Sequence, residues 1–412
     1  MKPSRLAVLL LASLASAALA ADWPQILGPQ RNGSTTGEGL ATDWPKEGPR
    51  VLWQRKVGNG FSGPVAAQGR LILFHREGNE EIVECLNATD GKTHWRNMYP
   101  TAYRDDFGFD PGPRATPTIA DGRVFTFGAE GRLVCEALAD GKQLWSVDGK
   151  QDFSARKGFF GLACSPLVEG RAVIVNLGGR DGAGVVAFDK DTGKVLWKAV
   201  DDEPSYSSPV AATLGGERLV LACTRSHFVG LDPATGKVRF QAGFRPPVQA
   251  SVTGASPLVM GDRVFISAGY DLGARLFRFQ AGNLHTVWEG DDQLSLQFTS
   301  AVHRDGFLYG LHGRHDFPGG TKLRCVELAT GKVRWSQPGL KGANVLLAGA
   351  QLLVLTEDGQ LLRVAAEPER FRETARALIL GADVRAHPAL ADGRFYARDK
   401  GRLVCVELGG SR

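Results

Sequence analysis

The segment Ala329-Thr330-Gly331-Lys332-Val333-Arg334-Trp335 determines how the chain folds, because close copies of it recur along the sequence. In each copy a Gly-Lys pair follows Asp or Thr, and an aromatic residue stands four positions after the glycine. The other clear copies are ATDGKTHW (88–95), DGKQLW (140–145), DTGKVLW (191–197) and ATGKVRF (234–240), with degenerate copies that end at Trp53 and Trp288. Glycine supplies the positive φ angle that a short hairpin needs, so each copy predicts a turn between two strands.

The aromatic positions from Trp53 to Trp335 are spaced about 47 residues apart, and each interval has the pattern of four strands. Four-stranded units at this spacing are typical of propeller blades. Six units end at an aromatic residue between Trp95 and Trp335, and one full unit and three further strands follow. The missing fourth strand is Val51–Arg55. We therefore predict an all-β fold: an eight-bladed β-propeller of four-stranded antiparallel blades over residues 51–408, closed by the N-terminal strand.

The N-terminal residues predict export. Lys2 and Arg5 precede a short apolar run, and Ala18-Leu19-Ala20 offers a cleavage site, which together indicate a signal peptide at residues 1–20. The apolar run is too short to span a membrane, and no cysteine follows the site to carry a lipid anchor. We expect a periplasmic or secreted monomer with a lead-in segment at 21–50 and a tail at 409–412. The net charge of +5, without basic runs among aromatics, argues against a nucleic-acid partner.

The Thr-Gly-Lys-x-x-Trp motif resembles the tryptophan-docking repeat of the pyrroloquinoline-quinone-type (quinoprotein-like) propellers. The opening segment 23–33 also looks like the start of secreted bacterial members of this group. The resemblance implies that one aromatic ring per blade packs against the turn glycine of the neighbouring blade. These docking residues are Trp53, Trp95, Trp145, Trp197, Phe240, Trp288 and Trp335.

The two faces of the predicted ring differ. The turns after first and third strands are short, whereas the connections on the other face include long segments such as 96–114 and 241–254. Long loops on a rigid scaffold tend to carry binding residues, so we expect an envelope protein or a small polar ligand at this face. The expected contacts are Arg104, Asp106, Arg114, Arg180, Tyr270, Arg314 and His315. The alternative is that these residues are solvated and only pair with one another.

Neither metals nor disulfides are expected. His312, His315 and Asp316 lack the fixed spacing of a metal site, and the acidic residues at 105–110 do not alternate as calcium ligands do. Four cysteines occupy one slot of the third strand in separate blades, too far apart for disulfides. These are Cys85, Cys135, Cys325 and Cys405. Cys164 and Cys223 fall in the first and second strands of neighbouring blades, and we expect all six thiols to be free and buried.

Three functions fit this sequence. The first is a non-catalytic binding or assembly scaffold in the cell envelope, similar to the propeller lipoprotein that helps to assemble outer-membrane β-barrels, although the lipid-anchor cysteine is lacking. The second is a quinoprotein dehydrogenase that oxidises an alcohol or sugar with pyrroloquinoline quinone and calcium. The resemblance implies adjacent, disulfide-bonded cysteines for such enzymes, and this sequence has no adjacent pair. The third is a carbohydrate or polymer binder. We favour the scaffold, with no catalytic residue and no cofactor.

Overall fold

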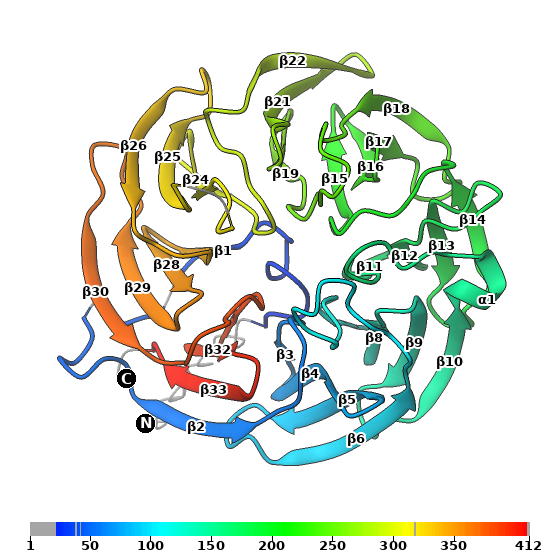
Figure 1. The fold of residues 1–412 in the computed structure, drawn as a ribbon, viewed down its shortest axis with the longest axis horizontal. Coiled ribbons are helices and arrows are strands. Elements are labelled where there is room, and N and C mark those ends of the chain that lie inside the picture. The colour runs from blue at the N-terminus through cyan, green and yellow to red at the C-terminus, as the bar shows by residue number, and fades with distance from the viewer. Residues whose placement is uncertain (1–21, 38, 42, 317–318, 410–412) are drawn as a thin grey trace, which may run out of the picture.

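The structure is a computed structural model that describes residues 22–37, 39–41, 43–316 and 319–409. The predicted signal peptide lies outside the described residues. Eight sheets are arranged as blades around a central axis (Figure 1), and each contains four consecutive antiparallel strands or their equivalent. The predicted eight-bladed propeller is confirmed.

Blades 1 to 4 follow the chain, and each runs from its innermost to its outermost strand. Their strands are β3 (Val65–Ala67), β4 (Arg70–Glu77), β5 (Glu80–Asn87) and β6 (Thr93–Pro100); β7 (Thr118–Ala120), β8 (Arg123–Phe127), β9 (Arg132–Ala137) and β10 (Gln143–Asp148); β11 (Leu167–Glu169), β12 (Ala172–Asn176), β13 (Val185–Asp189) and β14 (Val195–Ala199); β15 (Val210–Leu214), β16 (Glu217–Cys223), β17 (His227–Leu231) and β18 (Val238–Gly243). One short helix, α1 (Gly149–Phe153), lies in the connection between blades 2 and 3.

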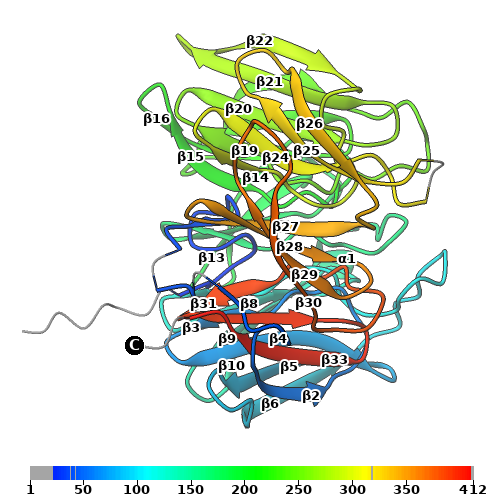
Figure 2. The same ribbon diagram turned by 90° about the vertical axis from the view of Figure 1, so that its left-hand side faces the viewer.

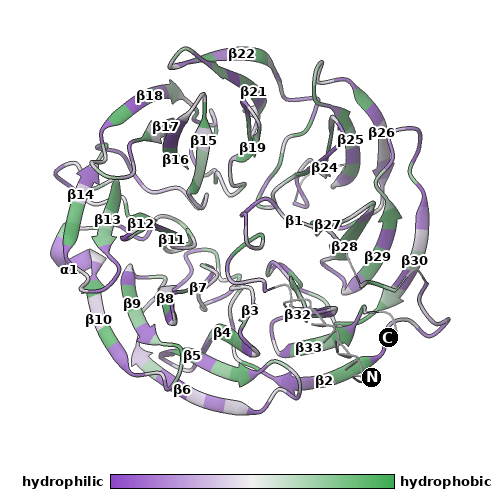
Figure 3. Ribbon diagram, turned by 180° about the vertical axis from the view of Figure 1, so that it is seen from behind, coloured by the Kyte–Doolittle hydropathy of each residue, from purple (hydrophilic) through white to green (hydrophobic). Residues whose placement is uncertain are grey.

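Blades 5 to 8 continue the pattern, with two additions from the N-terminal region. Their strands are β19 (Leu258–Met260), β20 (Arg263–Ala268), β21 (Gly273–Gln280) and β22 (Asn283–Gly290); β23 (Val302–Arg304), β24 (Phe307–His312), β25 (Lys322–Glu327) and β26 (Val333–Pro338); β27 (Ala343–Ala348), β28 (Gln351–Thr356), β29 (Gln360–Ala365) and β30 (Glu373–Leu378), with β1 (Ser34–Thr35); β31 (Ala389–Ala391), β32 (Arg394–Arg398) and β33 (Arg402–Glu407), with β2 (Val51–Lys56). Figure 3 shows hydrophilic residues along outer strands such as β6 and β30, which have one face in solvent.

The ring is closed by the N-terminal strand, as predicted. Strand β2 pairs antiparallel with β33, and Trp53 stands opposite Cys405. Blade 8 therefore consists of residues from the two ends of the propeller, and it leaves no unpaired edge at the point where the ring closes. Closure of this kind satisfies backbone groups that would otherwise be exposed along β33.

The lead-in segment crosses the centre of the ring (Figure 1). The Trp23 backbone exchanges hydrogen bonds with Ala66 of blade 1, and β1 pairs parallel with β27 of blade 7. The Arg31 side chain is 3% exposed and donates to the carbonyl oxygens of Ser165 and Pro166, at 3.0 and 2.9 Å. The segment thus contacts blades on opposite sides of the axis, and it ties them together on one face.

A repeated contact joins successive blades. Among the described residues, six indole N–H groups donate to a backbone oxygen of the next blade at 2.8–3.2 Å. The donor and acceptor pairs are Trp53–Ala88, Trp95–Leu138, Trp145–Lys190, Trp197–Pro233, Trp288–Leu328 and Trp335–Glu367. Gly141 shows why the turn needs glycine: its φ is +76°, and a Cβ there would lie 2.7 Å from the ring of Trp95. Phe240 cannot donate, and its ring instead packs 5.8 Å from that of Phe279.

The blade 7 position that corresponds to the docking tryptophan is Ala375, which stands opposite Arg363. A ring of the lead-in segment lies close to this position, since the Arg363 guanidinium is 5.4 Å from the centre of Trp44. The same side chain donates to the backbone oxygen of Ala41 at 3.0 Å. Gly48, with φ +90°, packs against the side chain of Ala377. Residues before β2 therefore take the place of the turn that blade 8 lacks.

Two buried carboxyl groups lie in the interface between blades 1 and 2. Glu81 accepts a hydrogen bond from the backbone N–H of Ala129 at 3.0 Å, and Glu136 accepts one from the Asn97 amide at 2.9 Å. Burial raises the pKa of each carboxyl to about 7, against a usual value of 4.5. The hydrogen bond from Ala129 opposes the shift at Glu81, and that from Asn97 opposes it at Glu136.

The six cysteines are buried and unpaired. Cys85, Cys135, Cys325 and Cys405 each stand opposite the docking tryptophan of their own blade, so they share one slot of the repeat. Cys223 ends β16, as expected, but Cys164 precedes β11 rather than lying in it. The Cys164 sulfur accepts a hydrogen bond from the Asn176 backbone, and burial raises its pKa to about 12.

A disulfide between β2 and β33 tests ring closure. Lys56 stands opposite Arg402, and directly opposed strand residues have Cα atoms close enough for an S–S bond. We expect the double substitution Lys56→Cys and Arg402→Cys to form an intramolecular disulfide on oxidation. It should raise the thermal midpoint above that of the same protein kept reduced, because it closes a very long loop. If the two introduced cysteines failed to form a disulfide, the pairing of β2 with β33 would be contradicted.

The thiols of the native protein should be unreactive. We expect a thiol-specific dye to label almost no cysteine in the folded protein and all six in denaturant without reductant, since the thiolate is the reactive form and burial disfavours it. The labelling stoichiometry measures this. Two or fewer reactive thiols in denaturant would mean that the register of the third strands is wrong.

The share of the folding stability that comes from Glu81 and Glu136 should fall as the pH rises from about 4.5 to about 7. The folded protein keeps Glu81 and Glu136 protonated in this range, whereas the unfolded chain releases those protons. The contribution of the two carboxyl groups to the free energy of unfolding is therefore lost as the pH rises through their pKa in the folded protein. We expect Glu136→Gln to lower the difference obtained by subtracting the urea midpoint at pH 8 from the urea midpoint at pH 5. The exposed Glu80→Gln is the control and should leave that difference unchanged. An equal difference in all three proteins would refute the assignment.

Candidate functional site

The connections between blades and the turns between second and third strands share one face, which we call the long-loop face. The longest of these connections are residues 101–117, 149–166 and 244–257. Figure 2 shows the disc from its edge, with the lead-in segment and the long connections towards opposite sides. The connection lengths differ from blade to blade, so this face does not follow the symmetry of the ring.

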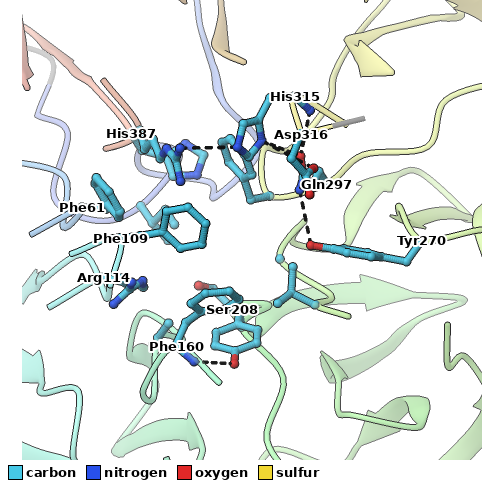
Figure 4. Close-up of a pocket in the computed structure, with 17 residues that line it drawn as sticks. Phe61, Phe109, Arg114, Phe160, Ser208, Tyr270, Gln297, His315, Asp316 and His387 are labelled. Carbon is cyan, nitrogen blue, oxygen red and sulfur yellow. Dashed lines mark hydrogen bonds and ion pairs between the residues drawn. The ribbon is translucent and has the colours of Figure 1, made fainter. Parts of the chain in front are cut away.

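A central cavity of about 200 Å³ opens among these connections (Figure 4). Nearly every blade contributes to its wall, and the lead-in segment contributes Ile26. The lining residues are Ile26, Phe61, Phe109, Arg114, Phe160, Ala163, Tyr206, Ser208, Val252, Gly254, Tyr270, Gln297, Phe298, His315, Asp316, Arg385 and His387. The wall thus combines six Phe and Tyr rings with seven polar or charged side chains. Apolar walls with a set of placed polar groups are common in ligand-binding sites.

Aromatic rings cluster at one side of the cavity and extend onto the surface. Phe160 lies 5.1 Å from Phe107 and 6.1 Å from Phe109, measured between ring centres. Phe107 and Phe109 are 51% and 45% exposed. The backbone N–H of Phe160 donates to the Tyr206 hydroxyl at 3.0 Å, which fixes the loop that carries this ring. Exposed phenylalanines that contact one another form an apolar patch, and such patches often mark interaction surfaces.

Arg114 holds the connection between blades 1 and 2 in place. Its guanidinium pairs with the Asp105 carboxylate at 2.8 Å and lies 5.5 Å from the ring centres of Phe61 and Phe160. Burial opposes ionisation of Asp105, but backbone N–H groups and Arg114 outweigh it and lower the pKa of that carboxyl. Arg114 is therefore both a lining residue and a structural element of its loop.

Arg385 also lies close to Phe61, within a group of three aromatic rings. Its guanidinium is 5.3 Å from the Phe61 ring centre, 5.5 Å from that of Phe109 and 6.0 Å from that of Phe298. The Nε atom donates to the Glu357 carboxylate at 2.7 Å. Its Nη1 atom has no hydrogen-bond partner among the described residues. Cation–π contacts leave the N–H edge of a guanidinium available, so Arg385 can donate to an acceptor in the cavity.

His315 is held as a neutral imidazole with Nδ1 protonated. The Gln297 amide nitrogen donates to Tyr270 and Asp316, so its Oε1 atom is the acceptor for His315 Nδ1–H at 2.9 Å. The Nε2 atom faces an Arg385 N–H at 3.4 Å. Burial, followed by the positive charge of Arg385, lowers the pKa of His315. This side of the cavity is therefore a polar network whose members already have partners.

The sequence-predicted contacts fall into three groups. Arg114, Tyr270 and His315 line the cavity. Arg314 lies beside it, since its guanidinium stacks 4.2 Å from the Tyr270 ring centre and pairs with Asp316. The other three do not line the cavity: Arg104 and Arg180 are exposed, and exposed Asp106 pairs with Lys157. The structure thus brings four of the seven together.

Several lining residues were not predicted. Phe61 lies in a glycine-rich connection that the sequence marks only as a linker, and Gln297 and Phe298 follow the degenerate motif at Trp288. Arg385 stands two residues before His387, whose His-Pro pair indicates the start of a strand. Burial lowers the pKa of His387 to about 4. These residues could have been predicted from their position, because they lie in connections between blades, and such connections meet at the centre of the ring.

The cavity differs in its donor set from the quinone site that the family resemblance implies. Asp316 is the one carboxylate among the lining residues, and no cysteine is among them. In the part of the chain that the structure describes, no group of three or more His, Cys, Asp or Glu side chains is placed to hold a metal ion. Among those same residues, no helix has the length and apolar character needed to cross a membrane.

Comparisons with known proteins identify relatives of two kinds. The chain is 26% identical to the outer membrane protein assembly factor BamB of Burkholderia pseudomallei over 357 residues, which is 82% of this chain and 83% of the relative. It is 31% identical to the quinoprotein alcohol dehydrogenase PedH of Pseudomonas putida over 121 residues, which is 28% of this chain but only 20% of PedH.

Solved structures show the same fold. BamB from Moraxella catarrhalis superposes with a TM-score of 0.65 at 16% identity, covering 87% of this chain and 99% of the other. The quinohemoprotein alcohol dehydrogenase from Comamonas testosteroni gives 0.68 at 15% identity, covering 97% and 82%. At these identities the likeness is one of fold alone.

A family model described as outer membrane protein assembly factor BamB matches residues 79–337. The match covers more than half of the chain, and it contains most of the tryptophan-docking motifs from which the sequence analysis began. The protein therefore belongs to the BamB family of pyrroloquinoline-quinone-type propellers.

Proposed function

We propose that the protein is a non-catalytic scaffold of the cell envelope that takes part in the assembly of outer-membrane proteins. The observation that carries this proposal is the match to BamB, which extends along most of both proteins, whereas the match to a dehydrogenase covers a fifth of that enzyme. The predicted signal peptide supports an envelope location, because an assembly factor for outer-membrane proteins must be exported.

The long-loop face is the proposed contact surface. It combines an exposed phenylalanine patch with guanidinium groups, and aromatic and arginine side chains are enriched at protein interfaces. The opposite face has short turns whose side chains serve the hairpins themselves, such as Asp232, which accepts hydrogen bonds within its own turn. The rival function is oxidation of an alcohol with pyrroloquinoline quinone and calcium.

Deletion of the gene in the source bacterium tests the proposal. We expect the abundance of outer-membrane β-barrel proteins, measured by quantitative mass spectrometry of isolated membranes, to fall and to recover with the wild-type chain. The double substitution Arg104→Ala and Arg180→Ala on the long-loop face should restore it less well than Lys237→Ala on the opposite face. Both variants change exposed side chains and should melt like the wild type.

An unchanged membrane proteome in the deletion strain would contradict the proposal. Dye-linked alcohol or sugar oxidation by the purified protein, dependent on added pyrroloquinoline quinone and calcium, would replace it with the dehydrogenase function. Equal complementation by the two variants would move the contact surface away from the long-loop face.

A further inference from the structure

The volume and the lining residues of the central cavity suit the binding of one large side chain. At about 200 Å³ it is closed towards the lead-in segment by Ile26, which is buried, and it opens at the long-loop face beside Phe109. Phe61, Phe160 and Phe298 are among the residues that line the interior. An aromatic side chain that entered would make offset or edge-on ring contacts in addition to burying its apolar area.

The charges around the cavity favour an acidic neighbour for that side chain. Glu357 and Asp105 pair with Arg385 and Arg114, but Nη1 of Arg385 stays without a hydrogen-bond partner among the described residues. Exposed Arg104 and Arg156, on the loops that also carry Phe107 and Phe160, form no ion pair with any described residue. His315 adds no positive charge, since it is neutral, and it cannot replace the guanidinium as a donor at that position.

We propose that the central cavity binds an aromatic side chain that stands next to an acidic residue in an extended segment of a partner protein. The ring fills the space between Phe61, Phe160 and Phe298, and the carboxylate accepts from Arg385. Phe107 and Phe109 cover the backbone of the segment at the rim. The inference rests on the proposed function in taking the occupant to be a protein, and it adds the chemistry by which that protein is recognised.

Three synthetic peptides labelled with fluorescein test this chemistry in solution with the full exported chain. We expect Gly-Glu-Phe-Glu-Gly to bind about tenfold more tightly than Gly-Glu-Ala-Glu-Gly or Gly-Lys-Phe-Lys-Gly, measured by fluorescence anisotropy. The alanine peptide removes the ring and the lysine peptide reverses the charge. Equal binding of all three peptides, or tighter binding of the lysine peptide, would overturn the proposal.

Two variants place the peptide in the cavity. Arg385→Lys keeps a positive charge beside Glu357 but removes the planar fork and its contacts with three rings, and Phe109→Ser removes a half-exposed ring from the rim. We expect each to weaken binding of the Glu-Phe-Glu peptide about tenfold. Leu378→Ser is the matched control, because Leu378 is a 74% exposed apolar residue on the outer strand β30, and it should bind like the wild type.

The outcomes separate this inference from the proposed function. Unchanged peptide affinity in both variants would overturn the inference, even where deletion of the gene lowers outer-membrane protein levels. Self-association of the full chain that Phe109→Ser abolishes would make a second copy the occupant and would likewise overturn it. Selective binding of the Glu-Phe-Glu peptide that both variants weaken supports the proposed binding of an aromatic side chain in the cavity. If the same protein shows this binding but deletion of its gene leaves the membrane proteome unchanged, only the proposed role in outer-membrane protein assembly is contradicted.

Discussion

The contact of each docking tryptophan with the next blade is the interaction on which the rest of the structure depends. A blade is a twisted sheet with apolar residues on both faces, so it is stable only between two neighbours. The indole ring covers the turn of the adjacent blade and its N–H satisfies a carbonyl there, which sets both the spacing and the angle between the sheets. Because the turn glycine has no Cβ, the ring can approach the backbone closely. Among the described residues this contact joins blades at six of the eight junctions, and the buried apolar residues form a series of clusters around the ring.

The same contact explains why the chain could be interpreted so far from its sequence. Glycine at a positive φ angle, a strand start after Ser-Pro and an aromatic residue at a constant offset are local features, and each has a local physical cause. They were sufficient to predict the blades, their number and the strand that closes the ring. Where tryptophan is replaced, as at Phe240 and Ala375, the indole hydrogen bond to the next blade is missing. The sequence alone did not show that Trp44 lies beside Arg363.

The cavity was predictable only in part, for a different reason. Its wall is made from connections that do not repeat, and residues as distant as Phe61 and Arg385 meet there because the ring brings blade ends to one axis. A motif shows that a loop is long, but not which of its side chains point inwards. Tyr270 and His315 could be chosen because they are polar residues in long loops, whereas Phe298 has no sequence feature that distinguishes it from a core residue.

The pairing of β2 with β33 also has a consequence for the order in which the molecule can form. Strand β2 is synthesised first in the propeller and pairs with β33, which is synthesised last. Residues 51–56 therefore cannot form their strand pairing until residues 402–407 have been synthesised. During synthesis, blade 8 is therefore incomplete after all the strands of the other seven blades have been made. Such a long-range pairing makes folding slow and leaves an open edge until the end. A chain that stops short of residue 402 is therefore an incomplete ring in which the backbone of β2 has no partner strand.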